Sequence, residues 1–413
     1  MDRDADILIA GGGPAGAWAA RRLAEAGARV RIFDASHPRE KPCGGGLTAR
    51  SLDLLGGAID ALPSVSITSV RFQAPPVRGP EYPHAPRSAP SVSLPVGTGS
   101  GHVPARPVSR LVTVDRTRFD ALLLESAQRA GAELVRSRVT AVDVSRDAVT
   151  LRTRTQSFRG RHLIGADGAA SLVRHRLAQR LPRSSLSIAL GAYVRDTSSS
   201  DIVIRFVNRP PGYIWSFPRT DHLAIGICAP AGQADPRALR RQLDAWLAAE
   251  GLAAGRRVEP YSWLIPSPDG TACQAGVPGG DRWLLVGDAA GLVDPLTREG
   301  IYYALLSGAR AADALLADGG SASARYAEAL RADVLPELAL AIRARRSFFW
   351  PTVSRLWVDA LAESPRVRAL GLAVVLGEVG YHHLRRTAVR RLEPAAALRI
   401  LGRQAGRHLR RGR

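Results

Sequence analysis

The chain has 413 residues, of which 46% are hydrophobic and 23% are charged, and its formal net charge is +20. The hydrophobic fraction lies in the globular range and excludes a chain that is disordered throughout, and the length suits roughly two to three packed domains. The three cysteines, Cys43, Cys228 and Cys273, lie far apart and form no CxxC pair. This spacing argues against a disulfide framework, a zinc knuckle and a dithiol redox centre.

The positive charge is concentrated near the C-terminus. Lys41 is the only lysine against 56 arginines, a skew that indicates compositional drift and weakens charge as a sign of function. Residues 336–413 hold 16 arginines and five acidic residues, and residues 381–413 alone hold ten arginines and one glutamate. The body of the chain is only mildly basic, so we expect no nucleic-acid partner.

The N-terminus is acidic and passes straight into a short apolar run, without the basic region of a signal peptide, which predicts a cytoplasmic protein. Residues 369–376 are wholly apolar, but a bilayer span needs about 20 such residues. This run is interpreted either as a buried helix or as a helix in the membrane interface. In the second case the basic tail behind it would rest on an anionic membrane surface; a solvated tail is the alternative.

The chain opens with a βαβ pattern. Residues 6–10 are an apolar run typical of a buried parallel strand, and residues 11–16 are a glycine-rich turn. An alanine-rich helical stretch ends at Gly27, and residues 29–33 form a second strand that closes on Asp34. A strand, a helix and a second strand in this order predict a parallel sheet.

Later segments indicate more of this sheet and then a second one. The apolar spacing predicts a helix at 119–130 and strands at 139–144, 149–151, 163–165 and 283–286. Residues 186–229 and 256–266 alternate apolar with polar residues and carry most of the aromatics, which predicts an antiparallel sheet. Residues 74–106 are dense in Pro, Gly and Ser and predict a long surface loop, and helices are expected from about residue 300.

The opening turn has the chemistry that a dinucleotide pyrophosphate needs. In Gly11-x-Gly13-x-x-Gly16, the first glycine makes the turn, the second admits the phosphates, and the third lets the helix pack closely. The helix N-terminus adds free N–H groups and a partial positive charge. Asp34 can accept the adenosine ribose hydroxyls, which favours FAD or NAD over NADP.

Two further segments separate FAD from NAD. Asp167-Gly168 and Gly287-Asp288 each follow a predicted strand, and a helix opens at Gly300-Ile301. Asp288 can bond the ribityl hydroxyls, and the N–H groups of Gly300 and Ile301 can face the flavin pyrimidine edge. Each Gly-Asp pair alone could be an ordinary turn, but the three elements in this order favour FAD.

With these motifs, residues 4–315 resemble the flavoprotein hydroxylase-like superfamily. The resemblance implies an α/β fold with an α+β insert: a Rossmann-like FAD-binding domain (1–73, 107–180 and 281–320) interrupted by an antiparallel-sheet substrate domain (181–280). The loop 74–106 and a helical, basic C-terminal region (321–413) complete it. No second GxGxxG occurs, so no separate nicotinamide domain is expected.

The resemblance also carries residue roles. Arg116, in the typical segment VDRTRFDALL, would lie near the FAD pyrophosphate and ribityl chain; a solvated arginine at a helix start is the alternative. The further cofactor contacts that the resemblance implies are Ala15, Cys43, Gly44, Gly46, Val139 and Pro295.

Two motifs resemble the geranylgeranyl reductase branch of this superfamily. One is KPCGGGL at 41–47, where the branch has a Cys-Gly segment beside the flavin, and the other is PPGYIWSFP at 210–218. In a strand, Tyr213, Trp215 and Phe217 face the same side. They would form an apolar wall for a polyprenyl chain, although such spacing also suits an ordinary core face.

The expected reaction is the hydrogenation of isolated isoprenoid double bonds by reduced FAD, with NAD(P)H or ferredoxin as electron donor. Cys43 is the candidate acid, or else it positions the flavin or is a small buried hydrophobe. Arg298 and Glu299 either touch the substrate head or the donor, or pair with each other. No HxH or HExxH pattern occurs, so no metal is expected.

Three rival functions use the same fold. An FAD-dependent hydroxylase of a hydrophobic small molecule is the first alternative, since oxygen chemistry needs few diagnostic residues. A halogenase needs a lysine between flavin and substrate, and Lys41 stands in the wrong place for that role. A non-catalytic flavoprotein is the third.

Overall fold

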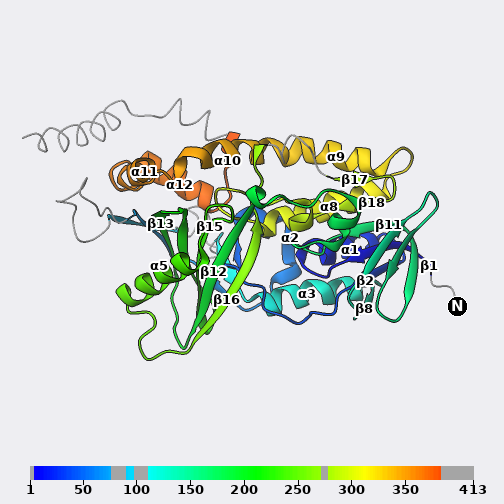
Figure 1. The fold of residues 1–413 in the computed structure, drawn as a ribbon, viewed down its shortest axis with the longest axis horizontal. Coiled ribbons are helices and arrows are strands. Elements are labelled where there is room, and N and C mark those ends of the chain that lie inside the picture. The colour runs from blue at the N-terminus through cyan, green and yellow to red at the C-terminus, as the bar shows by residue number, and fades with distance from the viewer. Residues whose placement is uncertain (1–3, 76–89, 97–109, 271–277, 383–413) are drawn as a thin grey trace, which may run out of the picture.

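The computed structural model describes residues 4–75, 90–96, 110–270 and 278–382. Two sheets lie toward opposite ends of the molecule, and helices α8, α9 and α10 run along one side of it (Figure 1). The basic tail from residue 383 onward, with its predicted membrane contact, lies outside the described residues. No helix among those described is long and apolar enough to cross a bilayer.

The first sheet is the predicted nucleotide-binding sheet. Its strand order is β17-β18-β11-β1-β2-β8, and β9 and β10 extend it from β11. Strands β1, β2, β8, β11 and β18 pair in parallel. Their bounds are β1 Asp4–Ala10, β2 Val30–Phe33, β8 Glu133–Val135, β9 Ala141–Val144, β10 Val149–Arg152, β11 Ser157–Gly165, β17 Gly279–Gly280 and β18 Trp283–Leu285.

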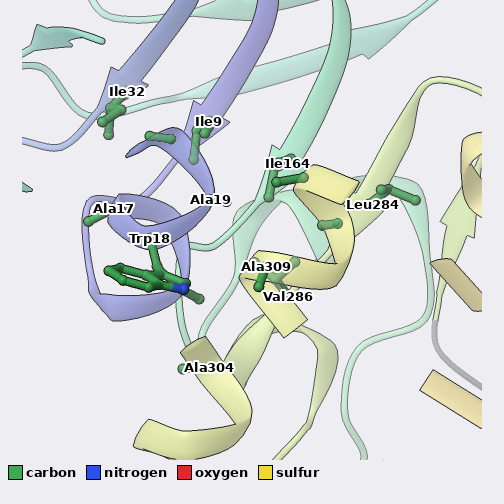
Figure 2. Packing of buried hydrophobic residues seen from close by; sticks show 14 of the residues in the cluster. Ile9, Ala17, Trp18, Ala19, Ile32, Ile164, Leu284, Val286, Ala304 and Ala309 are labelled. Carbon is green, nitrogen blue, oxygen red and sulfur yellow. The ribbon is translucent and has the colours of Figure 1, made fainter. Parts of the chain in front are cut away.

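Small residues let two helices pack closely against this sheet. Helix α1 (Pro14–Glu25) and helix α8 (Ile301–Leu316) are rich in alanine and share one hydrophobic core with the strands. Figure 2 shows Ala17 and Ala19 of α1 and Ala304 and Ala309 of α8 within this cluster. Helix α3 (Arg116–Arg129) packs on α1 as well.

The second sheet has seven strands in the order β16-β12-β15-β14-β13-β5-β6. It is antiparallel as predicted, except that β13 and β5 pair in parallel. Its strands are β5 Ser69–Gln73, β6 Ser91–Pro95, β12 Leu186–Arg195, β13 Asp201–Asn208, β14 Pro211–Pro218, β15 His222–Pro230 and β16 Val258–Pro266. The loop predicted over residues 74–106 therefore contains a strand, because the alternation in 91–95 pairs with β5.

Each face of the second sheet is covered by helices. Helix α5 (Pro236–Ala249), which the sequence patterns did not predict, packs on one face through Leu239, Leu243 and Trp246. The C-terminal helices cover the other face, where Phe349, Val358 and Leu361 join the core. The helices on this face are α10 Leu335–Phe348, α11 Pro351–Glu363 and α12 Pro365–Val375, whereas α9 Ala322–Asp333 packs on α8 and joins the core of the first sheet.

The apolar run at 369–376 belongs to α12 and is only partly buried: Gly371 and Leu376 are buried, and Ala369 is exposed.

A small three-stranded sheet completes the fold. Its order is β3-β7-β4, with β3 Gly46–Leu47, β4 Ser64–Ser66 and β7 Val112–Val114. Because β3 follows the Cys-Gly segment directly, this sheet fixes that segment against β7. The remaining short helices are α2 Ala49–Leu55, η1 Gly56–Ile59, α4 Leu172–Leu177, η2 Arg183–Ser185 and α7 Gly287–Ala290.

The α1–α8 contact leaves no room for one added methyl group. A Cβ at Gly308 would lie 2.4 Å from the carbonyl oxygen of Ala15, which is backbone and cannot rotate away. We expect Gly308→Ala to lower the free energy of unfolding by about 1–2 kcal/mol, because overpacking outweighs the gain in helix propensity. Chemical denaturation measures the change. Gly232→Ala, where an added Cβ meets open space, should have little effect, and a more stable Gly308 variant would contradict the prediction.

Candidate functional site

The glycine-rich turn after β1 has the predicted geometry. A Cβ at Gly16 would lie 2.0 Å from the carbonyl oxygen of Gly11, and a Cβ at Gly11 would lie 2.4 Å from that of Ala166. Nothing lies within 4 Å of a Cβ at Gly13. The two outer glycines thus permit close packing, while the middle one borders space at the N-terminus of α1, where a pyrophosphate can approach the backbone.

Asp34 lies directly beside this turn. Its Oδ2 accepts the Gly12 N–H at 2.8 Å, and its Oδ1 accepts both the N–H and the hydroxyl of Ser36. Burial opposes ionisation, but the hydrogen bonds from Ser36 and Gly12 outweigh it and lower the pKa of Asp34. Asp34 is therefore a carboxylate at neutral pH, as acceptance of ribose hydroxyls requires.

The carboxylate of Asp167 caps a helix. It accepts the hydroxyl of Ser171 at 2.5 Å and the N–H of Val173 at 3.1 Å, at the start of α4. Burial raises its pKa despite these bonds. Asp167 and Gly168 lie after β11 as predicted, and their contact with the cofactor stays a prediction.

Asp288 lies after β18, and its Oδ2 binds Lys41 Nζ at 2.8 Å. The only lysine of the chain thus reaches one of the predicted flavin-binding residues. Helix α8 begins at Ile301 with Gly300 as its N-cap, and no side chain caps its first turn. Among the other residues that the resemblance assigned to the cofactor, Ala15 and Pro295 are buried and Val139 is partly buried just before β9.

These residues fit FAD. The open space at Gly13 lies at a helix N-terminus, and the ionised Asp34 stands 21 residues along the chain beside the same turn. Asp288 and the uncapped start of α8 both follow β18 in the chain. This strand neighbours β11 on the side away from β1. The set offers an anion site, a ribose acceptor and a second carboxylate in one line along the carboxyl ends of parallel strands.

Cys43 lies in a polar cage. Its Sγ accepts the N–H of Gly45 and the Nη1 of Arg116, each at 3.1 Å. Arg116 is itself buried and binds both carboxylate oxygens of Asp120 at 2.7 Å. The alternative of a solvated arginine at a helix start is therefore wrong, and Arg116 contacts the predicted reactive thiol.

The Cys-Gly segment and the aromatic strand, which lie about 170 residues apart in the sequence, are in direct contact. A Cβ at Gly44 would lie 3.1 Å from the ring of Phe217, and one at Gly46 would lie 3.2 Å from it. Arg219, at the end of β14, donates to the carbonyl oxygens of Cys43 (3.0 Å) and Gly44. The two motifs therefore build one site.

The aromatic side chains share one face, as the strand period predicted. Tyr213 and Trp215 are buried in the same cluster, and Phe217 packs against it partly buried. The ring of Tyr213 stacks on Phe349 at 6.3 Å, and its hydroxyl donates to the carbonyl of Thr297 at 2.6 Å. We call Tyr213, Trp215 and Phe217 the aromatic row; its end at Tyr213 reaches the loop before α8.

Several residues at this site were missed by sequence reasoning. Arg219 is buried, and Glu40, whose pKa is raised by burial, accepts from Thr117. Glu299 binds Arg50 and Thr48 and not Arg298, so the alternative in which Arg298 and Glu299 pair with each other is wrong. The sequence signal for Arg219 was its place directly after the aromatic motif.

A second missed group ties the C-terminal region to the loop before α8. Asp294 is buried in the loop before α8, and its Oδ2 accepts the hydroxyl of Tyr381 at 2.7 Å. Burial raises the pKa of Asp294. Tyr381 also donates its N–H to Glu337 of α10 at 2.6 Å.

Several known proteins are similar to this one in sequence and in fold. A family model described as an FAD binding domain matches residues 4–245. A menaquinone reductase from Mycobacterium tuberculosis is 31% identical over 344 residues, 76% of this chain and 77% of the relative. A geranylgeranyl diphosphate reductase from Rhodobacter capsulatus is 31% identical over 332 residues, 76% of this chain and 75% of the relative.

Solved structures agree on the fold. A geranylgeranyl bacteriochlorophyll reductase-like protein from Thermoplasma acidophilum superposes with a TM-score of 0.70 at 20% identity, covering 90% of this chain and 96% of that one. A flavin-dependent brominase reaches 0.67 at 18% identity, covering 98% and 100%; at such identities the likeness shows the fold alone. With its matched FAD-binding model and its relatives above 30% identity, the chain belongs to the geranylgeranyl reductase family of FAD-dependent oxidoreductases.

Proposed function

We propose that this protein reduces isolated C=C bonds of an isoprenoid chain. The observation that carries the proposal is the contact between the Cys-Gly segment and the aromatic row, which brings a thiol, a segment predicted to bind the cofactor and an apolar face together. The names of the relatives support it, since they include reductases of geranylgeranyl diphosphate and of menaquinone.

The aromatic row suits a ligand with few hydrogen-bonding groups. Tyr213 and Trp215 are each at most 7% exposed, and their face is covered by Phe349 and other apolar side chains of the C-terminal helices. A polyprenyl chain can replace these apolar side chains on the aromatic row without leaving polar groups unpaired. The row therefore binds and orients the polyprenyl chain. Its end at Phe217, next to the Cys-Gly segment, has no group that can donate a proton.

Reduction of an isolated double bond needs a hydride and a proton. FAD, when bound and reduced, supplies the hydride. In our proposal the Cys43 thiol supplies the proton to the second carbon, and Arg116 and Arg219 position it, one at the sulfur and the other at the carbonyls of the segment. The N–H of Gly45 fixes the sulfur from the opposite end of the turn.

Halogenation is disfavoured by the position of the only lysine. The ammonium of Lys41 binds Asp288, on the predicted ribityl side, instead of standing between flavin and substrate. Hydroxylation is separated from reduction by its need for oxygen.

The deciding experiment is anaerobic incubation of the dithionite-reduced holoenzyme with several prenyl substrates, read by mass spectrometry. We expect the product to gain the mass of two hydrogens for each reduced bond. Oxygen-dependent gain of one oxygen atom would identify a hydroxylase instead, and no reaction with any prenyl chain would refute the reductase assignment.

Cys43→Ala should lower the turnover number roughly 10²- to 10⁴-fold, the usual contribution of a positioned general acid. FAD content should remain that of the wild type, because Asp34 and the glycine-rich turn are untouched. Flavin absorbance and the rate of alkene reduction measure the two effects. The matched variant Cys43→Ser keeps a smaller donor at the same place. Its turnover number should fall between those of the wild type and the alanine variant. Turnover equal to wild type in the alanine variant would remove Cys43 from the mechanism.

We further propose that the basic C-terminal tail gives the enzyme peripheral contact with an anionic membrane. Ten arginines against one glutamate in residues 381–413 support this, since each basic residue near such a surface contributes about 1 kcal/mol. A lipid-chain substrate would be found at the same surface. Tyr381 is part of the folded body through Asp294 and Glu337, so the tail to be tested begins after His382.

Truncation after His382 should weaken co-sedimentation with vesicles containing phosphatidylglycerol, most strongly at low ionic strength. FAD content and thermal stability should stay unchanged, because the bonds of Tyr381 to Asp294 and Glu337 are kept. Neutral vesicles serve as the control. Equal binding of the truncated and full chains to the anionic vesicles would show that the tail is not the anchor.

A further inference from the structure

Arg298 adopts a backbone conformation that an arginine rarely takes. It lies in the loop between α7 and α8, and its φ is +63°. Among the described residues only one other non-glycine residue has a positive φ, Asp196 in an exposed turn after β12 (+57°). A bulky side chain held in this region is strained, and such strain gathers at binding sites.

The side chain of Arg298 has buried donors without acceptors. Its Nε and Nη1 are shielded from solvent and find no hydrogen-bond partner within the part of the chain that the structure describes. Buried donors of a cation are costly when left unpaired. Glu299, the neighbouring carboxylate, is engaged by Arg50 and Thr48 instead.

Arg298 stands at one end of the aromatic row. The carbonyl of the preceding residue, Thr297, accepts the Tyr213 hydroxyl at 2.6 Å, which pins the loop onto the row. The charge of Arg298 acts on both Tyr213 and the buried thiol of Cys228, on the adjacent strand. A ligand that contacted Arg298 could therefore extend along an apolar face.

A second arginine, Arg345 of helix α10, is acted on by the charge of Arg298. Arg345 Nη1 donates to the hydroxyl of Ser267 at 2.5 Å, just beyond the end of β16. Burial, together with the positive charges of Arg298 and Arg346, lowers the pKa of Arg345 to about 10. The acidic side chain that acts on it, Asp269, also accepts a hydrogen bond from Ser184. Positive charge is thus in excess between the loop and α10.

We propose that Arg298 and Arg345 bind the phosphate or diphosphate head of the prenyl substrate, whose chain then lies along the aromatic row. Guanidinium groups suit this head because they bind phosphate oxygens in a bidentate manner and are less strongly hydrated than an ammonium. The site deepens the proposed function and rests on it for the identity of the chain, but not for the binding of the anion. It selects a phosphorylated prenyl substrate over one with a neutral quinone head.

The test is calorimetric binding to the FAD-loaded protein, without turnover. Inorganic pyrophosphate and geranylgeranyl diphosphate are the probes, geranylgeraniol is the uncharged counterpart, and short-chain phosphatidylglycerol distinguishes a lipid phosphate from a prenyl diphosphate. We expect Arg298→Gly and Arg345→Gln each to weaken pyrophosphate and geranylgeranyl diphosphate binding about 10- to 100-fold, as expected for a charge-assisted hydrogen bond. Binding of geranylgeraniol should change little.

Thermal stability separates a binding role from a structural one. Arg298→Gly removes backbone strain and the unpaired donors, so we expect its Tm to rise while anion binding falls. Asp196→Gly relieves the same kind of strain elsewhere and should raise Tm with binding intact. Arg331→Gln, on the exposed side of α9, controls for the loss of one positive charge and should leave both quantities near wild type.

Unchanged pyrophosphate affinity in both Arg298→Gly and Arg345→Gln would overturn the site. Equal weakening by Arg331→Gln would also overturn it, because it would show a general effect of net charge. Tighter binding of phosphatidylglycerol than of geranylgeranyl diphosphate would overturn the assignment to the substrate head. If every prenyl substrate failed to be reduced while these variants still lost pyrophosphate binding, the reductase function would fall and the anion site would stand.

Discussion

The site depends on the fork that Arg219 forms on the carbonyls of Cys43 and Gly44. This arginine is 1% exposed and follows β14 of the seven-stranded sheet, whereas the Cys-Gly segment leads into β3 of the three-stranded sheet. The two Nη groups of Arg219 would be left unpaired if the segment moved away, so the carbonyls cannot leave them without cost. The fork therefore fixes how far the thiol stands from the aromatic row, and it does so through backbone atoms that any substitution in the segment retains.

The positively charged side chains around Cys43 have acidic neighbours. Arg116 is compensated by Asp120 within one helix turn, and Glu40, whose pKa is raised by burial, faces Arg219. Each cation thus has an acidic neighbour, while the sulfur receives a donor that is already paired. The guanidinium of Arg116 can be kept dry at low cost, because its charge is balanced locally before it touches the thiol.

The parts of the site that could be predicted are those that a short segment encodes. The turn at Gly11, the ribose carboxylate of Asp34 and the shared face of the aromatic row all follow from local spacing, and the structure shows the geometry expected of each. Residues such as Arg219, or the pair formed by Asp294 and Tyr381, act across separations that leave no periodic signal. Strand β6 was hidden for a related reason, since its pairing with β5 outweighs the turn-forming residues around it.

The C-terminal helices connect the aromatic row with the loop before α8. They cover the aromatic row, where Phe349 stacks on Tyr213, and the segment that follows α12 returns to Asp294 in the loop before α8. A ligand that lies along the row must displace side chains of these helices and not the strands. The strands are fixed by backbone hydrogen bonds to their neighbours in the sheet. Tyr381 joins the same helical region to the loop that precedes α8, because it bonds both Glu337 of α10 and Asp294 of that loop. The packing of the C-terminal helices on the aromatic row is thus linked to the loop before α8 through the hydrogen bond between Tyr381 and Asp294.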